Sequence, residues 1–228
     1  MSWTGPAVIV ARTTELAEQL LADGELRCPR CHTGRLAAWG HGRRRTVRDL
    51  DDTTVTVRPR RTRCRSCSST HVVMPAALQP RHADTTAVIG MALLHKANGI
   101  GHRRIAALLN RPAPTVRRWL RRLPPAHLER IYQDGTKALL ALSRDTFTTL
   151  RNTGNPLHHA LTILSAAAYF DRHRYGLLDP PWTLIGLYTR GRLLAPPHRP
   201  PLHAPASAPG AGLGIPASTV TMTRTASW

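Results

Sequence analysis

The four cysteines of this 228-residue chain stand in two C-x-x-C pairs. Cys28 and Cys31 form the first pair, Cys64 and Cys67 form the second, and 32 residues separate the two. A C-x-x-C turn presents two thiolates from one tight loop, and two such loops together close the tetrahedral site that structural Zn²⁺ prefers. The spacing therefore predicts one structural zinc ion held by all four cysteines, in a module that unfolds without the metal.

Two other uses of paired cysteines fit the sequence less well. A thioredoxin-like redox pair lacks its βαβ surroundings and leaves the second pair unexplained, and disulfides are disfavoured in a reducing cytoplasm. Glycine is usual after the second cysteine of each turn, whereas His32 and Ser68 stand there, so we expect a less relaxed backbone. His32, His41 and His71 are spare candidate ligands that we expect to lie on the surface.

Arginine dominates the charge of the chain. Its 32 Lys and Arg side chains outnumber 13 Asp and Glu, and only Lys96 and Lys137 are lysines. Arginine grips phosphate through two parallel N–H donors and stacks on bases, so an acidic partner is expected. Between Leu26 and His71, 12 Arg against three Asp give a net charge of +9. This predicts a hairpin that lies along a phosphate backbone, the alternative being a merely solvated hairpin.

Residues 102–119 follow the pattern of a helix-turn-helix. Ile105 and the small Ala106 belong on the inner face of the first helix. Asn110 stands where the turn needs a left-handed residue, a conformation that Asn tolerates well. Pro112 and Pro114 prevent one continuous helix, and Pro114 suits a first helical turn.

The second helix of this pattern carries an apolar face and a basic face. Val116, Trp119 and Leu120 share one side, which directs Arg117, Arg118 and Arg121 to the other. We expect Arg118 and Arg121 to read base edges, most often guanine, while other arginines hold phosphates. A generic three-helix bundle shows the same apolar pattern, but the seven arginines and the absence of acids between residues 101 and 123 favour DNA. The predicted DNA-binding residues are Thr115, Arg117, Arg118, Arg121, Arg122, Arg103, Arg104, Arg111, Arg43, Arg44 and Arg45.

The elements that position these residues predict an α+β protein, with a small zinc-ribbon β module followed by an all-α helix-turn-helix domain and further helices. We expect an N-terminal strand-helix at 1–25, the zinc ribbon at 26–80, the helix-turn-helix at 83–123, a helical segment at 124–194 and a disordered tail at 195–228. Two strands flank residues 51–53, and Asp84 is expected to cap the first helix of the helix-turn-helix domain.

With both motifs in place, the chain resembles the N-terminal DNA-binding region of bacterial insertion-sequence transposases. The matching features are Cys28-Pro-Arg-Cys31, the arginine-rich stretch 39–50, Arg61-Thr-Arg-Cys64-Arg-Ser-Cys67 and the pattern from Ile105 to Trp119. It looks closest to uncharacterised proteins of high-GC bacteria that have these parts without a catalytic domain, and the resemblance covers residues 26–123. Such transposases cut DNA with two Asp and one Glu, but Glu129 is the last Glu of this chain, so catalysis is not carried over.

These observations together predict a cytoplasmic, nucleoid-associated protein that is not an enzyme. We expect it to bind double-stranded DNA as a transcriptional regulator or as the recognition protein of a mobile element. Residues 126–190 are a possible homodimerisation segment, because palindromic operators need two-fold symmetry. An RNA- or ribosome-associated zinc-ribbon protein is the alternative, although Trp39 is the one obvious stacking aromatic in the basic region. No apolar run is long enough to span a membrane.

Overall fold

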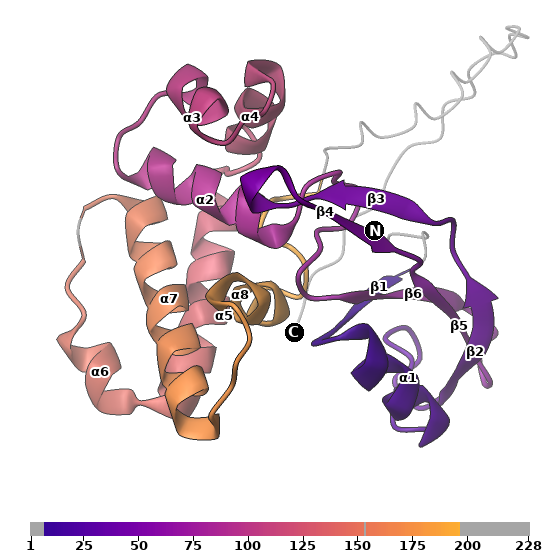
Figure 1. Ribbon diagram of the computed structural model, residues 1–228. Coiled ribbons are helices and arrows are strands. Elements are labelled where there is room, and N and C mark those ends of the chain that lie inside the picture. Colours follow the sequence, from indigo (N-terminus) through magenta and orange to yellow (C-terminus); the bar gives the residue numbers. More distant parts are fainter. Residues whose placement is uncertain (1–6, 153, 197–228) are drawn as a thin grey trace, which may run out of the picture. The chain divides into compact units, whose positions relative to one another are not determined.

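A four-stranded sheet carries the cysteine region. In the computed structural model, which describes residues 7–152 and 154–196, β1 (Ala7–Ala11), β6 (Thr70–Pro75), β5 (Arg60–Cys64) and β2 (Leu36–His41) pair in that order. β1 runs parallel to β6, with Ile9 opposite Val73, and the other pairs are antiparallel. The strand of the predicted segment 1–25 therefore lies in the same sheet as strands of the predicted segment 26–80 (Figure 1).

The helix after β1 begins as its sequence predicts. α1 (Thr14–Ala22) follows Thr13, whose hydroxyl accepts a hydrogen bond from the Leu16 N–H, and such a cap satisfies a backbone donor that the helix leaves free. Ala17 and Leu21 are the buried residues of this helix. Leu21 packs against Cys28 and Leu36, so α1 covers the cysteine region.

A separate two-stranded hairpin packs against this sheet. β3 (Arg45–Arg48) and β4 (Thr54–Val57) pair in antiparallel fashion and are joined through a short turn, η1 (Leu50–Asp52), as the alternating segments predict. Val47 and Val57 are buried against Met74 and Leu78, so the hairpin packs on the sheet through one apolar face.

Seven helices follow in the described chain, and all of them except α6 contribute to one large hydrophobic core, which includes both helices of the predicted helix-turn-helix. They are α2 (Thr86–Ala97), α3 (His102–Leu108), α4 (Ala113–Leu120), α5 (Pro125–Leu142), α6 (Arg144–Thr149), α7 (Pro156–Tyr175) and α8 (Pro181–Tyr188). Trp119 of α4, Ile131 of α5 and Leu164 of α7 are all buried in this core. Apart from α1 and the short turn η1, the described helices all follow the last strand, which confirms the α+β class.

Close backbone approaches hold α8 in place. A Cβ atom added at Gly186 of α8 would lie 2.1 Å from the carbonyl oxygen of Ala76, at the end of β6. A Cβ atom at Gly90 of α2 would lie 2.3 Å from the ring of Trp182. Only glycine fits at either point, so α8 contacts both the strand region and the helical core.

Two local features differ from the sequence-based expectation. Asp84 does not cap α2, because Thr85 occupies the cap and its hydroxyl accepts a hydrogen bond from the Val88 N–H. The short helix α6 is not apparent from the sequence pattern. Most of the segment 195–228 that we expect to be disordered lies outside the described residues. None of the helices in the described part of the chain is long and apolar enough to cross a membrane.

Candidate metal centre and basic surface

The two C-x-x-C turns meet at one end of the sheet. The Sγ atoms of Cys28 and Cys67 are 3.6 Å apart, and those of Cys31 and Cys64 are 3.7 Å apart. All four Sγ atoms lie within 4.8 Å of one another, and all four cysteines are free. These separations are far longer than a disulfide bond of about 2.05 Å. The sequence-predicted ligands are therefore brought together as one possible metal site.

Both turns use the same backbone arrangement. The Arg30 N–H donates to the sulfur of Cys28, and the Ser66 N–H donates to that of Cys64, each at 3.4 Å. His32 and Ser68 adopt left-handed φ angles of 60° and 57°, which explains why glycine is common at these positions. Each turn thus directs backbone donors at its sulfurs, which favours thiolates.

Space around the sulfurs is tight. A Cβ atom added at Gly34 would lie 2.3 Å from the Sγ atom of Cys64, so the loop before β2 needs glycine to let the second turn approach. Cys28 and Cys64 are buried, whereas Cys31 and Cys67 are partly exposed. The site is thereby shielded on one side by the sheet and α1.

Without a cation, the thiols differ sharply in acidity. Burial raises the pKa of Cys28 to about 11, while hydrogen bonding from the Gly34 N–H lowers the pKa of Cys31 to about 6. A bound cation would favour the thiolate at every position, because it stabilises the charged form of each ligand. The geometry and the soft donor set together suit a structural metal ion.

His71 contacts this cluster, although we expected it on the surface. The residue is 3% exposed, and its Nε2 lies 3.3 Å from the sulfur of Cys28. Burial lowers its pKa, so the neutral ring can donate Nε2–H to the thiolate. His71 is therefore a supporting residue that sequence reasoning missed. Its place on the alternating pattern of β6 was the available signal, because the buried Val73 lies two residues further along.

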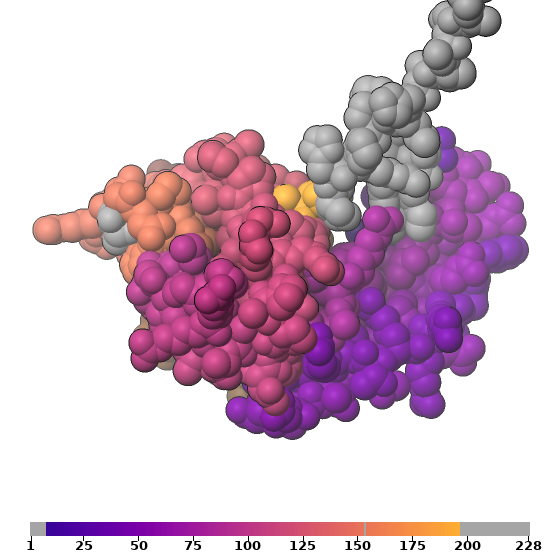
Figure 2. Space-filling view, turned by 90° about the horizontal axis from the view of Figure 1, so that it is seen from above, coloured from indigo at the N-terminus to yellow at the C-terminus, as the bar shows by residue number. Residues whose placement is uncertain are grey.

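The predicted recognition helix presents its basic face to solvent. On α4, Val116 and Trp119 are buried, whereas Arg117 and Arg118 are exposed, as is Arg121 at the end of the helix. Asn110 in the turn has a φ angle of 48°, the left-handed conformation that the sequence predicts. Figure 2 looks onto the face that carries α3 and α4, where their magenta surface continues into the purple surface of the strand region.

Most of the other predicted DNA-binding residues are exposed as well. Arg103 and Arg104 of α3 are exposed, as are Arg43 and Arg44 before β3, while Thr115 of α4 is partly buried. These arginines remain free to face a polyanion.

The environment of Arg111 contradicts its predicted role as a DNA contact. We expected it to hold a phosphate, but it is 7% exposed and its Nε donates to Asp84 at 2.8 Å. Another guanidinium nitrogen donates to the carbonyl oxygen of Asp49 at 2.6 Å, next to η1. Arg48 of β3 also pairs with Asp84, at 2.9 Å. Arg111 therefore ties the turn between α3 and α4 to the hairpin, instead of reaching solvent.

A second contact strengthens this connection. The Asn110 side-chain amide donates to both carboxylate oxygens of Asp52, at 2.9 and 3.0 Å. Thr85 donates its hydroxyl to the Asp49 carboxylate at 2.7 Å. The tip of the β3–β4 hairpin is thus fastened to the turn, and the hairpin arginines keep a defined position relative to α4.

Arg122 and Arg45 are also less free than predicted. Arg122 donates Nε–H to the carbonyl oxygen of Ala195 at 2.6 Å, and a terminal nitrogen lies 2.6 Å from Nε2 of His82. Arg45 is partly buried beside the same histidine, with one terminal nitrogen 3.5 Å from the His82 carbonyl oxygen. Neither side chain is a freely exposed phosphate contact, because both converge on the loop at residues 79–84.

Trp39 makes a cation–π contact with an arginine. The indole is 47% exposed, and the Arg63 guanidinium lies 4.8 Å from the ring centroid. A cation–π contact of this kind occupies one ring face. Base stacking at Trp39 would therefore use the other face or displace Arg63.

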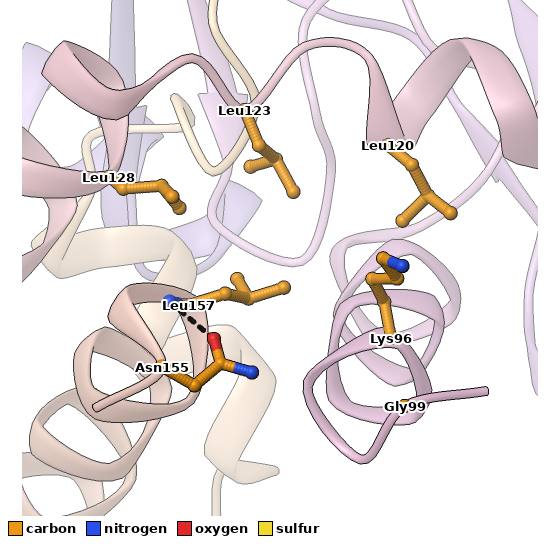
Figure 3. A pocket seen from close by; sticks show the side chains of 7 residues that line it. All are labelled: Lys96, Gly99, Leu120, Leu123, Leu128, Asn155 and Leu157. Carbon is orange, nitrogen blue, oxygen red and sulfur yellow. Dashed lines mark hydrogen bonds between the residues drawn. The ribbon is translucent and has the colours of Figure 1, made fainter. Parts of the chain in front are cut away.

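A cavity of about 330 Å³ lies between α2, α4, α5 and α7 (Figure 3). Its lining includes Leu120, Leu128 and Leu157, with Lys96 at one side. Asn155, which also lines it, accepts from the N–H groups of Leu157 and His158 and so caps α7. The cavity is mainly apolar, and the side-chain amide of Asn155 already makes hydrogen bonds within the fold.

Part of the chain is similar to a known family model. Residues 28–119 match a family model described as a domain of unknown function (DUF6431). No curated protein and no solved structure matches the chain. The matched stretch begins at the first cysteine and ends at Trp119 of α4, so the cysteine region, the hairpin and both helices of the basic face fall within one region shared with that family.

Proposed function

We propose that this protein binds double-stranded DNA in a sequence-specific manner, with α3 and α4 acting as a helix-turn-helix and the cysteine region holding structural zinc. One observation carries the proposal. The face of α4 opposite Trp119 is exposed and arginine-rich, and the turn before it is fastened to a hairpin that carries further arginines. A helix supported in this way can enter a major groove while the hairpin follows the backbone.

Zinc is the metal that best suits the four thiolates. A tetrahedral site with Zn–S distances of about 2.3 Å has sulfur–sulfur edges of about 3.8 Å. The observed separations of 3.6 and 3.7 Å support this assignment. Elemental analysis of purified chain is expected to find one zinc per polypeptide, and folded material without zinc would contradict it.

Arg118 and Arg121 are the proposed base-reading residues, and Arg103 and Arg104 the proposed phosphate contacts. Guanine presents two acceptors that a guanidinium binds through two parallel hydrogen bonds. The protein would act by occupancy, as a transcriptional regulator or as the recognition protein of a mobile element. Self-association through residues 126–190 would suit a palindromic site and remains a prediction.

Selection of bound sequences from a random duplex pool tests the proposal. After selection, Arg118→Ala is expected to weaken binding by about 1–3 kcal/mol and to relax the sequence preference at one position. Arg104→Ala is the matched control, because losing a phosphate contact weakens all sequences alike and lowers the salt dependence by about one charge. Equal effects of both variants on all sequences would contradict base reading by Arg118.

An RNA-associated role is the second candidate, and the exposed Trp39 favours it. Competition between duplex DNA, single strands and structured RNA separates the two. Preference for RNA, lost on Trp39→Ala, would replace the DNA proposal, since stacking on an aromatic ring supports binding of unpaired bases.

A further inference from the structure

Two arginines converge on one histidine where the hairpin, the loop 79–84 and the connection between α4 and α5 meet. Arg45 stands at the start of β3, and Arg122 follows α4 by two residues. Nε2 of His82 lies 2.6 Å from a terminal nitrogen of Arg122, and the His82 carbonyl oxygen lies 3.5 Å from one of Arg45. Three basic side chains thus share a small volume.

Within the part of the chain that the structure describes, no carboxylate pairs with the positive charge of this cluster. In residues 7–152 and 154–196, no acidic side chain forms an ion pair with Arg45 or Arg122. Asp84 is the nearby acid, but its two oxygens receive Arg48 and Arg111. Buried charges in proteins are normally paired, so the cluster lacks a counter-ion.

Unused hydrogen-bond donors mark where a counter-ion would sit. Nε and one terminal nitrogen of Arg45 are buried and have no hydrogen-bond partner among the described residues. Water does not reach these atoms, and a guanidinium nitrogen left without an acceptor is costly. Arg45 as a whole is partly exposed, so a ligand can approach its guanidinium from solvent.

His82 fits beside an anion as a neutral group. Burial, together with the charges of Arg122 and Arg45, lowers its pKa to about 4. The neutral ring accepts a hydrogen bond from Arg122 and leaves the remaining guanidinium donors for another acceptor. A tetrahedral oxyanion offers several acceptor oxygens at once, and arginine pairs with phosphate in a two-point geometry.

We infer that Arg45 and Arg122, aligned by His82, form a binding site for one phosphate group. The phosphate belongs to a duplex backbone, if the proposed function holds, or to a free phosphate compound. In the first case the site joins the hairpin to the end of the recognition helix through one nucleotide. In the second case it is a ligand site independent of DNA binding.

Thermal unfolding of the full zinc-loaded chain with inorganic phosphate tests the site itself. Phosphate at constant ionic strength, balanced with chloride, is expected to raise Tm by about 3–5 °C at tenfold excess over its Kd. Arg45→Gln and Arg122→Gln should abolish this shift. Arg43→Gln and Arg118→Gln, which lie within four positions of the two cluster arginines in the sequence but are exposed, should retain it. A phosphate-dependent rise in Tm that persists in both cluster variants would overturn the proposal. It would also be overturned if phosphate left the Tm of the parent protein unchanged and Arg45→Gln left the salt dependence of duplex binding unchanged.

The ligand-free variant separates a binding role from a structural one. Because Arg45 holds buried donors without acceptors, Arg45→Gln is expected to leave Tm unchanged or raised in the absence of phosphate. A marked drop in Tm would show that the arginine is needed by the fold, and would overturn the inference.

Duplex binding identifies the source of the phosphate. If a backbone phosphate occupies the site, Arg45→Gln lowers the slope of log K against log salt by about 0.9, and inorganic phosphate competes with the duplex. If a free compound occupies it, Tm still responds to phosphate while duplex affinity is equal in both proteins. Failure of the proposed function has a different signature, because a chain indifferent to duplex can keep the phosphate-dependent shift.

Discussion

The surroundings of the four cysteines and of Trp119 differ in what holds them together. Around the cysteines, the buried apolar side chains are Leu21 and Leu36, which pack with Cys28 and Cys64. Around Trp119, buried side chains from six helices form one continuous core. A small cluster buries too little apolar surface to offset chain entropy, so we expect the cysteine region to depend on a bound metal and the helical region to depend on packing.

Metal removal is expected to have the largest effect. Structural zinc contributes on the order of 10–16 kcal/mol, so a chelator or Cys64→Ser should unfold the cysteine region. Helical circular dichroism should largely persist, because α2 to α5 and α7 keep their own core. Ser66→Ala, an exposed position in the same turn, is the control. Simultaneous loss of helix and sheet signals would show instead one cooperative unit, joined through α8.

Trp119→Ala should destabilise the helical region and leave the cysteine region intact. Removing this buried ring is expected to cost about 3–5 kcal/mol of unfolding free energy, measured by urea titration, while bound metal stays at the level of the parent protein. Leu108→Ala on α3 is the control, since that side chain is 55% exposed. Loss of zinc from the tryptophan variant would break the division between the two regions.

Sequence reasoning located residues well where local pattern sets their environment. The cysteine spacing, the two faces of α4 and the left-handed Asn110 all follow from neighbours within a few positions. It located residues poorly where a partner far away in the sequence determines whether the side chain is buried. Arg111 resembles its exposed neighbours in sequence, and only folding brings Asp84 to it from 27 residues away.

Contacts between strands that are far apart in the sequence were not predicted either. The parallel pairing of β1 with β6 joins residues more than 60 positions apart, which periodicity does not report. His71 was misplaced for the same reason, because its contact with Cys28 spans 43 residues. What the sequence leaves open is therefore which distant charges and strands meet, whereas the chemistry of each candidate site is largely local.

Arg111→Met probes the joint between the two regions. The exposed fractions of the Arg111 and Asp84 side chains are 3% and 2%, so removing one partner should cost about 3 kcal/mol. The double variant Arg111→Met, Asp84→Leu is expected to recover part of that loss, because no buried charge is stranded. DNA affinity should fall in both variants if the hairpin must be held against α4. Unchanged affinity in a folded variant would separate the hairpin from DNA binding.

The smallest effect concerns the backbone of the cysteine turns. His32→Gly and Ser68→Gly should each stabilise the metal-bound chain by up to about 1 kcal/mol, since residues with a side chain are strained at φ angles near 60°. Gly34→Ala should do the reverse, because its methyl group would meet the Cys64 sulfur. Chelator competition measures both, as metal retention reports how well the two turns close. If the glycine variants lose metal more readily, His32 and Ser68 support the site through their side chains, and the turns are held by more than backbone geometry.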